Sequence, residues 1–120
     1  MRSKVYISHA ITTPQPSRTY NWYIAVEVYR RLILAGYSVF CPALSMNCPD
    51  NMLIDHATWL EQDLPWVAAS DMVLRLPGES KGADMETEFA RERGIPVLSP
   101  SDFICLHELF LPKWQLQNCA

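Results

Sequence analysis

The sequence lacks any cluster of basic residues, and this absence limits the partners we expect. Lysine and arginine together number 10 against 13 aspartate and glutamate residues, which gives a formal net charge of −3. Binding to a nucleic-acid polymer requires grouped Lys and Arg side chains that neutralise the phosphate backbone. We therefore expect no nucleic-acid polymer as a partner, whereas a mononucleotide, which needs only a few donors, remains open.

Cysteine patterns typical of metal sites and long apolar runs are also missing. The four cysteines form no C-x-x-C pair and do not combine with a histidine at the spacing of a zinc site. The first ten residues lack the apolar segment of a secretory signal, and no apolar run is long enough to span a membrane. We expect a cytoplasmic protein with reduced thiols, no bound metal and no membrane partner.

What the sequence does contain is a regular alternation of short apolar segments and helical patterns over 120 residues, enough for one domain. We predict strands at Lys4–Ser8 and within 37–43, 71–78 and 95–100, and helices over 20–35, 52–69 and 82–93. In the first helix the apolar stripe includes Trp22, Ala25 and Leu32. The order predicts an α/β fold, a three-layer Rossmann- or flavodoxin-like parallel sheet of four to five strands with helices on both faces.

Ligands in such a fold bind at the carboxyl ends of the strands. The segment SKGADMETE, Ser80 to Glu88, falls at this edge. Gly82 allows the backbone to approach a ligand, and the free N–H groups of a helix start favour an anion such as phosphate. Ser80 either adds a hydroxyl to that site or caps the helix. Glu86 is either an ordinary acidic residue near a helix start, or a carboxylate that attacks or stabilises a sugar carbon as its glycosidic bond breaks.

The segment SKGADMETEFARERGIPV resembles the signature of the nucleoside 2-deoxyribosyltransferase-like superfamily. That signature has a Gly, a Glu four residues later, an Ala four residues after that, and then Gly-x-Pro-Val. Here these positions are Gly82, Glu86, Ala90, Gly94, Pro96 and Val97. The resemblance covers about Lys4 to Val97. The chain is most similar to a small, often phage-encoded branch of the superfamily that has Leu-Pro-Gly before Ser-x-Gly-Ala-x-x-Glu.

The resemblance implies an N-glycosidase or deoxyribosyltransferase that cleaves the N-glycosidic bond of a nucleoside or nucleoside 5′-monophosphate. Glu86 would be the nucleophile, and no metal or organic cofactor is implied. In the superfamily the monophosphate hydrolases have a serine that binds phosphate at the position of Ser80, whereas the transferases have an aspartate there. At this position the chain resembles the hydrolases. Asp71 matches an aspartate common at the start of the third strand, where it either binds substrate or ends the preceding helix and hydrogen-bonds a neighbouring backbone. The resemblance also implies a homo-oligomer, to which the apolar tail of residues 100–120 could contribute.

Further residues complete the expected site. Asp63 on the second helix could orient the sugar or a water molecule, and Trp59 could stack on a base. His9 stands where the superfamily usually has a glycine, and it could bind phosphate or donate a proton to the leaving base. The remaining residues expected to bind substrate, at the loops of the same edge, are Ser8, Gly78 and Ala83.

Two other functions remain open. Ala83 replaces a common Thr and Glu88 replaces a small residue, and these departures are compatible with a module that binds nucleotides or nucleotide sugars without cleaving them. The third hypothesis is a structural protein that uses its apolar tail as an interface.

Overall fold

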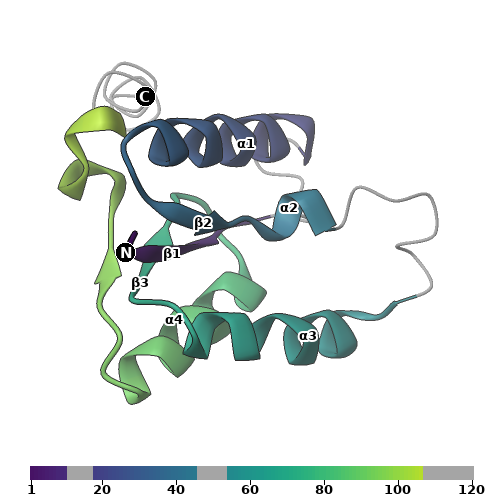
Figure 1. The fold of residues 1–120 in the computed structure, drawn as a ribbon. Coiled ribbons are helices and arrows are strands. Elements are labelled where there is room, and N and C mark those ends of the chain that lie inside the picture. Colours follow the sequence, from purple (N-terminus) through teal and green to yellow (C-terminus); the bar gives the residue numbers. More distant parts are fainter. Residues whose placement is uncertain (11–17, 46–53, 107–120) are drawn as a thin grey trace.

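A computed structural model describes residues 1–10, 18–45 and 54–106. In these ranges the elements are β1 (Lys4–Ser8), α1 (Arg18–Leu34), β2 (Ser38–Phe40), α2 (Pro42–Ser45), α3 (His56–Ala68), β3 (Met72–Arg75), α4 (Lys81–Glu92) and β4 (Val97–Leu98), followed by a 3₁₀ helix (Pro100–Asp102). Figure 1 shows α1 on one side of the sheet and α3 with α4 on the other. The predicted three-layer α/β fold is confirmed.

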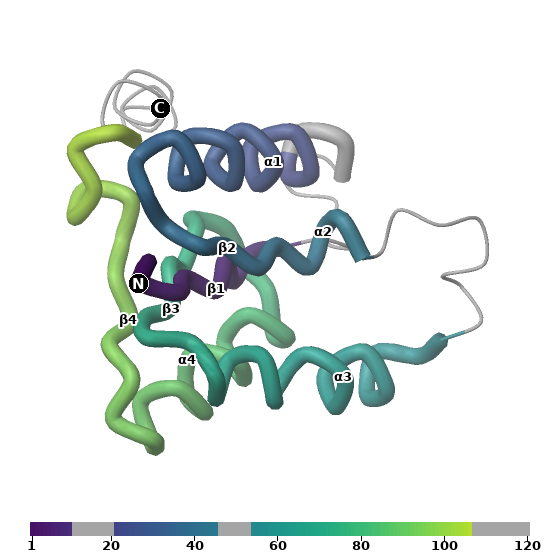
Figure 2. The backbone as a smooth tube through the Cα atoms, in the orientation of Figure 1, coloured from purple at the N-terminus to yellow at the C-terminus, as the bar shows by residue number. Residues whose placement is uncertain are grey.

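The sheet has the order β2-β1-β3-β4 within the described residues, and its neighbouring strands are parallel. Ser8 at the end of β1 is level with Arg75 at the end of β3. Because all strands point the same way, their carboxyl ends lie at one edge of the sheet. The backbone trace in Figure 2 shows α3 and α4 side by side across this sheet from α1.

The alternation of side chains along each strand divides the core into two parts. Tyr6 and Val73 face α3 and α4, where they pack against Val67 and Ala90. Ser8 lies two residues beyond Tyr6, and Arg75 lies two residues beyond Val73. Both therefore project toward α4 at the carboxyl edge. The other part of the core lies between the sheet and α1. It is formed by Val5, Ile7 and Leu74 of the sheet and by Ile24, Ala25, Val28 and Leu32 of α1.

Helix boundaries follow local signals in the sequence. Gly36, with a φ of +103°, ends α1, in agreement with the helix predicted over 20–35. The N–H of Tyr37 donates to the carbonyl of Leu32 at 3.0 Å. The carboxylate of Asp55 accepts the N–H of Thr58 at 2.8 Å, so α3 begins at His56 rather than at residue 52.

Two expectations about this part of the fold are wrong. The sequence predicted a strand and a loop where α2 forms. Trp22, expected in the core stripe of α1, is 38% exposed. Of the predicted stripe, Ala25 and Leu32 are buried, together with Ile24 and Val28.

The start of the expected tail packs on the core, whereas residues 107–120 lie outside the described ranges. Phe103 and Leu106 are buried on the α1 side of the sheet, and the Phe103 ring meets Tyr37 edge to face. Cys41 and Cys105 are free thiols, and the expected thiols of Cys48 and Cys119 lie outside the described residues. No described helix has the length and apolar character needed to cross a membrane. In the same residues there is no group of three or more His, Cys, Asp or Glu side chains suited to a metal ion.

Candidate active site

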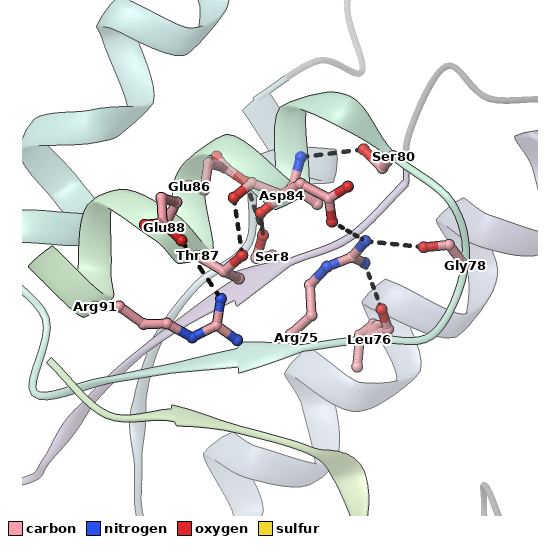
Figure 3. Close-up of polar contacts among 11 residues, drawn as sticks. Ser8, Arg75, Leu76, Gly78, Ser80, Asp84, Glu86, Thr87, Glu88 and Arg91 are labelled. Carbon is pink, nitrogen blue, oxygen red and sulfur yellow. Dashed lines mark hydrogen bonds and ion pairs between the residues drawn. The ribbon is translucent and has the colours of Figure 1, made fainter.

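Glu86 lies on the face of α4 that packs against the sheet. The buried residues of this helix recur every three or four positions, at Ala83, Glu86, Thr87 and Ala90, so Glu86 belongs to the stripe that covers the core. Its side chain is largely enclosed, and the residue is only 7% exposed. Glu88, by contrast, faces solvent and lies 4.0 Å from Arg91, the pairing expected from their spacing (Figure 3).

Two hydroxyl groups of β1 hold the Glu86 carboxylate. The Tyr6 hydroxyl donates to Oε2. The Ser8 hydroxyl donates to Oε1 at 2.9 Å (Figure 3). The Ser8 oxygen also lies 3.3 Å from the carbonyl oxygen of Ala83. Because each carboxylate oxygen has its own donor, the orientation of Glu86 at the carboxyl edge of the sheet is fixed from two sides.

Burial dominates the acid–base behaviour of Glu86. Removal from water raises the pKa of this carboxyl from 4.5 to about 7, with a further increase from the negative charge of Asp63. The hydrogen bonds from Tyr6 and Ser8 and the positive charge of Arg75 act in the opposite direction and only partly offset the burial. Near neutral pH the group is therefore divided between its charged and neutral forms, as suits a residue that gains and loses charge in a reaction.

Asp63 on α3 brings a second buried carboxyl to the same place. It is 6% exposed, and burial raises its pKa from 3.8 to about 6. The Tyr6 hydroxyl lowers the pKa of Asp63 by hydrogen bonding, and burial followed by the charges of Glu86 and Asp63 raises the pKa of Tyr6 itself. Tyr6 therefore keeps its proton and donates a hydrogen bond to Glu86.

Ser80 is the N-cap of α4, as one of the two alternatives for this residue predicted. Its side-chain oxygen accepts the N–H of Ala83 at 3.1 Å, and its carbonyl accepts the N–H of Asp84 at 3.0 Å. The first-turn N–H groups of Lys81 and Gly82 have no acceptor within the helix. Space at Gly82 is open, because an added Cβ would meet nothing nearer than the Ser80 hydroxyl oxygen at 4.0 Å. Binding of phosphate here stays a prediction.

Arg75 shapes the turn that leads into α4. Its guanidinium group donates to the carbonyls of Leu76 at 2.5 Å and Gly78 at 2.8 Å, and to the carboxylate of Asp84 at 3.1 Å (Figure 3). Gly78 has a φ of +121°, which other residues rarely adopt, and it lies close to Ala10. Gly78 thus shapes a turn at the carboxyl edge, and any contact it makes with substrate stays a prediction.

His9 does not fit the proton-donor role that the sequence suggested. It is 6% exposed, and burial, together with the charge of Arg75, lowers its pKa from 6.5 to about 4. Its Nδ1 lies 2.9 Å from the carbonyl oxygen of Ala10. The ring is neutral at pH 7 and has no spare proton to give to a leaving base.

Asp71 lies at the wrong end of the sheet for the role expected of it. Its carboxylate accepts the N–H of Lys4 at 2.7 Å, which places it at the amino ends of β1 and β3. Four residues of β3 separate it from the carboxyl edge. Asp71 thus joins two strands, and the structure does not bring it to Glu86.

Trp59 lies on α3, one turn before Asp63, and is partly buried. Its indole Nε1 is enclosed and has no hydrogen-bond partner among the described residues. The aromatic stack beside the site is formed by other residues: Phe40 lies between Tyr6 and Trp66, with ring centroids 5.5 and 5.2 Å away. Stacking of a base on Trp59 stays a prediction.

Tyr6 and Arg75 belong to the site although neither was predicted there. A signal for both was present, because Tyr6 shares a strand face with Ser8 and Arg75 ends the third strand just before the expected loop. What the sequence could not supply was the register between α4 and the sheet, which decides that the Tyr6 hydroxyl meets Glu86.

Comparison with known families identifies the family of this chain. The chain belongs to the family described as Domain of unknown function (DUF4406), whose model matches residues 3–99. Its fold is similar to the crystal structure of a conserved protein from Enterococcus faecalis V583, with a TM-score of 0.64 and 21% sequence identity over 82% of this chain. The chain spans 63% of the length of that protein. Comparison with curated proteins gives no match.

Proposed function

We propose that the protein cleaves the N-glycosidic bond of a nucleoside or nucleoside 5′-monophosphate, with Glu86 as the nucleophile. The observation that carries this proposal is a buried glutamate at the carboxyl edge of a parallel sheet, with a hydroxyl donor on each oxygen. The resemblance of residues 80–97 to the nucleoside 2-deoxyribosyltransferase-like superfamily gives the reaction class.

In the proposed reaction the Glu86 carboxylate attacks C1′ of the sugar. A C1′–Oε bond forms while the C1′–N bond breaks, and the base departs with the electron pair and takes up a proton from solvent water. Water, or a second base in a transferase, then displaces Glu86 and releases its carboxylate. The Tyr6 and Ser8 hydroxyls orient the nucleophile before attack and stabilise its charge on release. Asp63, with a pKa of about 6, is positioned to orient the sugar or the incoming water.

The start of α4 is the proposed place for a 5′-phosphate. The N–H groups of Lys81 and Gly82 and the Ser80 hydroxyl hydrogen can donate to it, and the helix dipole favours its charge. Ser80→Asp tests this, because aspartate retains the helix cap and adds a negative charge. We expect monophosphate binding to weaken at least about tenfold in S80D, and binding of the matched nucleosides to stay within about twofold. Equal losses for both ligands would place the phosphate elsewhere.

Incubation with a panel of nucleosides and monophosphates, followed by chromatography for free base, tests the reaction. A second arm adds an excess of a different base: a new nucleoside indicates transfer, and free sugar or sugar phosphate indicates hydrolysis. No base release from any member of the panel would contradict the proposal.

One observation favours a second candidate, a nucleotide-binding module without turnover. Both oxygens of Glu86 already have donors, as in a buried carboxyl with a purely structural role. Nucleotide binding without base release would identify this case. We also propose a cytoplasmic, homo-oligomeric protein, and sedimentation analysis measures the oligomeric state.

A further inference from the structure

His9 has a definite tautomer because of its contact with the backbone. The Ala10 carbonyl oxygen, 2.9 Å from Nδ1, can only accept a hydrogen bond, so Nδ1 must carry the proton. In a neutral ring the other nitrogen, Nε2, is then an acceptor with a free lone pair. Enclosure of the side chain and the nearby charge of Arg75 both disfavour a second proton on the ring.

Nε2 is buried and has no hydrogen-bond partner among the described residues. A buried polar atom without a partner is unfavourable, so folded proteins rarely leave one unsatisfied without a reason. Two further atoms in the described ranges share this condition, Trp59 Nε1 and Asp63 Oδ1. The charge of Asp63 acts on Glu86. His9 directly follows Ser8, whose hydroxyl donates a hydrogen bond to Glu86. His9 follows the carboxyl end of β1, and its ring is close enough to Arg75, at the end of β3, for that charge to act on it. The unpartnered Nε2 therefore lies at the carboxyl edge of the sheet.

We propose that His9 Nε2 accepts a hydrogen bond from a hydroxyl or amino group of the bound ligand. His9 is then a specificity-determining residue that selects ligands with this donor over analogues that lack it. The inference rests on the proposed nucleoside or nucleotide ligand and adds a selection rule to it. A neutral acceptor favours an O–H or N–H group, and it gives no attraction to a fully ionised phosphate, which has no proton to donate.

The expected discrimination follows from the burial of the acceptor. A ligand without the donor leaves Nε2 unpaired in an enclosed place. The loss of affinity is then larger than when a hydrogen bond at an exposed surface is lost. His9→Leu removes the acceptor. His9→Gln is the matched variant, because its side-chain carbonyl can replace Nε2 as an acceptor.

The test uses the full chain labelled with ¹⁵N and the 5′-monophosphates of the common ribo- and deoxyribonucleosides, with analogues lacking one hydroxyl or amino group. Ring ¹⁵N shifts identify the tautomer, and the spectrum of His9→Gln assigns the His9 signals. We expect a neutral ring with the proton on Nδ1, and a shift of the Nε2 signal when a monophosphate binds. Calorimetry should show about tenfold weaker binding in H9L, a loss within about threefold in H9Q, and no preference between the matched ligands in H9L.

The outcomes separate this inference from the proposed reaction. Binding that moves the Nε2 signal without base release removes the reaction and leaves the role of His9 intact. A proton on Nε2, or binding that leaves the Nε2 signal and the H9L affinity unchanged, overturns the inference even if base is released. Absence of binding by every monophosphate and analogue overturns both.

Discussion

Glu86→Gln should stabilise the protein at alkaline pH, although it removes the proposed nucleophile. In the unfolded chain this carboxyl has its ordinary pKa of 4.5, whereas burial raises the pKa to about 7 in the folded protein. Between these values the folded protein holds more protons at Glu86 than the unfolded chain does. The free energy of unfolding of the wild type therefore falls as the pH rises through this window.

The size of the effect follows from the two pKa values. Each pH unit of difference corresponds to about 1.4 kcal/mol, so ionised Glu86 lowers the stability above pH 8 by up to about 3 kcal/mol. Glutamine stays neutral, and its amide oxygen can still accept from Tyr6 or Ser8. We expect E86Q to be more stable than the wild type by about this amount at pH 8.5, and within about 1 kcal/mol of it at pH 4.5. For a chain of this length, 3 kcal/mol is on the order of 10 °C in Tm.

Urea unfolding and thermal melts of both proteins between pH 4.5 and 8.5 measure the difference. The buried carboxyl of Asp63 remains in both, so the difference between the two curves reports Glu86 together with its coupling to Asp63. Glu88→Gln is the matched control, because Glu88 is exposed two residues further along α4 and should change stability by less than about 0.5 kcal/mol. A wild type that stays as stable as E86Q at pH 8.5 would refute the burial argument.

Three other substitutions test the surroundings of Glu86. Tyr6→Phe removes a donor that lowers the pKa of Glu86, so the acid limb of the pH–rate profile should move to higher pH. Base release should slow at least about tenfold. An unchanged profile would contradict the role of Tyr6. Arg75→Gln should raise the titration midpoint of Glu86, measured by ¹³C NMR of its carboxyl. It should also cost about 1–2 kcal/mol of stability, because three contacts of the turn are lost. Arg75→Lys keeps the charge and should move the midpoint less. Asp71→Ala should cost about 1 kcal/mol in urea unfolding and leave base release within twofold; a large loss of activity would mean that Asp71 does reach the site.

The fold could be predicted because each of its signals is local. Short apolar segments, separated by helical patterns of which two end at glycine, define a parallel α/β sheet without any long-range information. The boundary errors have local causes too. The cap at Asp55 shortened α3, and α1 is apolar on so many sides that periodicity alone placed Trp22 in the core stripe together with Ala25.

The site was predictable only in part, because it depends on contacts between distant residues. The position of Glu86 near the strand ends follows from the order of the elements, but its inward direction does not. Tyr6 and Glu86 are 80 residues apart, and their contact requires the packing register of α4 on the sheet. Asp71 was misplaced for a simpler reason: a residue that begins a strand lies at the edge opposite to the one where ligands bind.

The most direct test of the account is the rate of base release by wild type, E86Q and E88Q, measured side by side on whichever member of the panel the wild type cleaves. We expect E86Q to lose about 10³-fold or more in kcat while still binding the ligand, and E88Q to stay within twofold of the wild type. Base release by E86Q at a rate close to that of the wild type would contradict the central claim that Glu86 performs the chemistry.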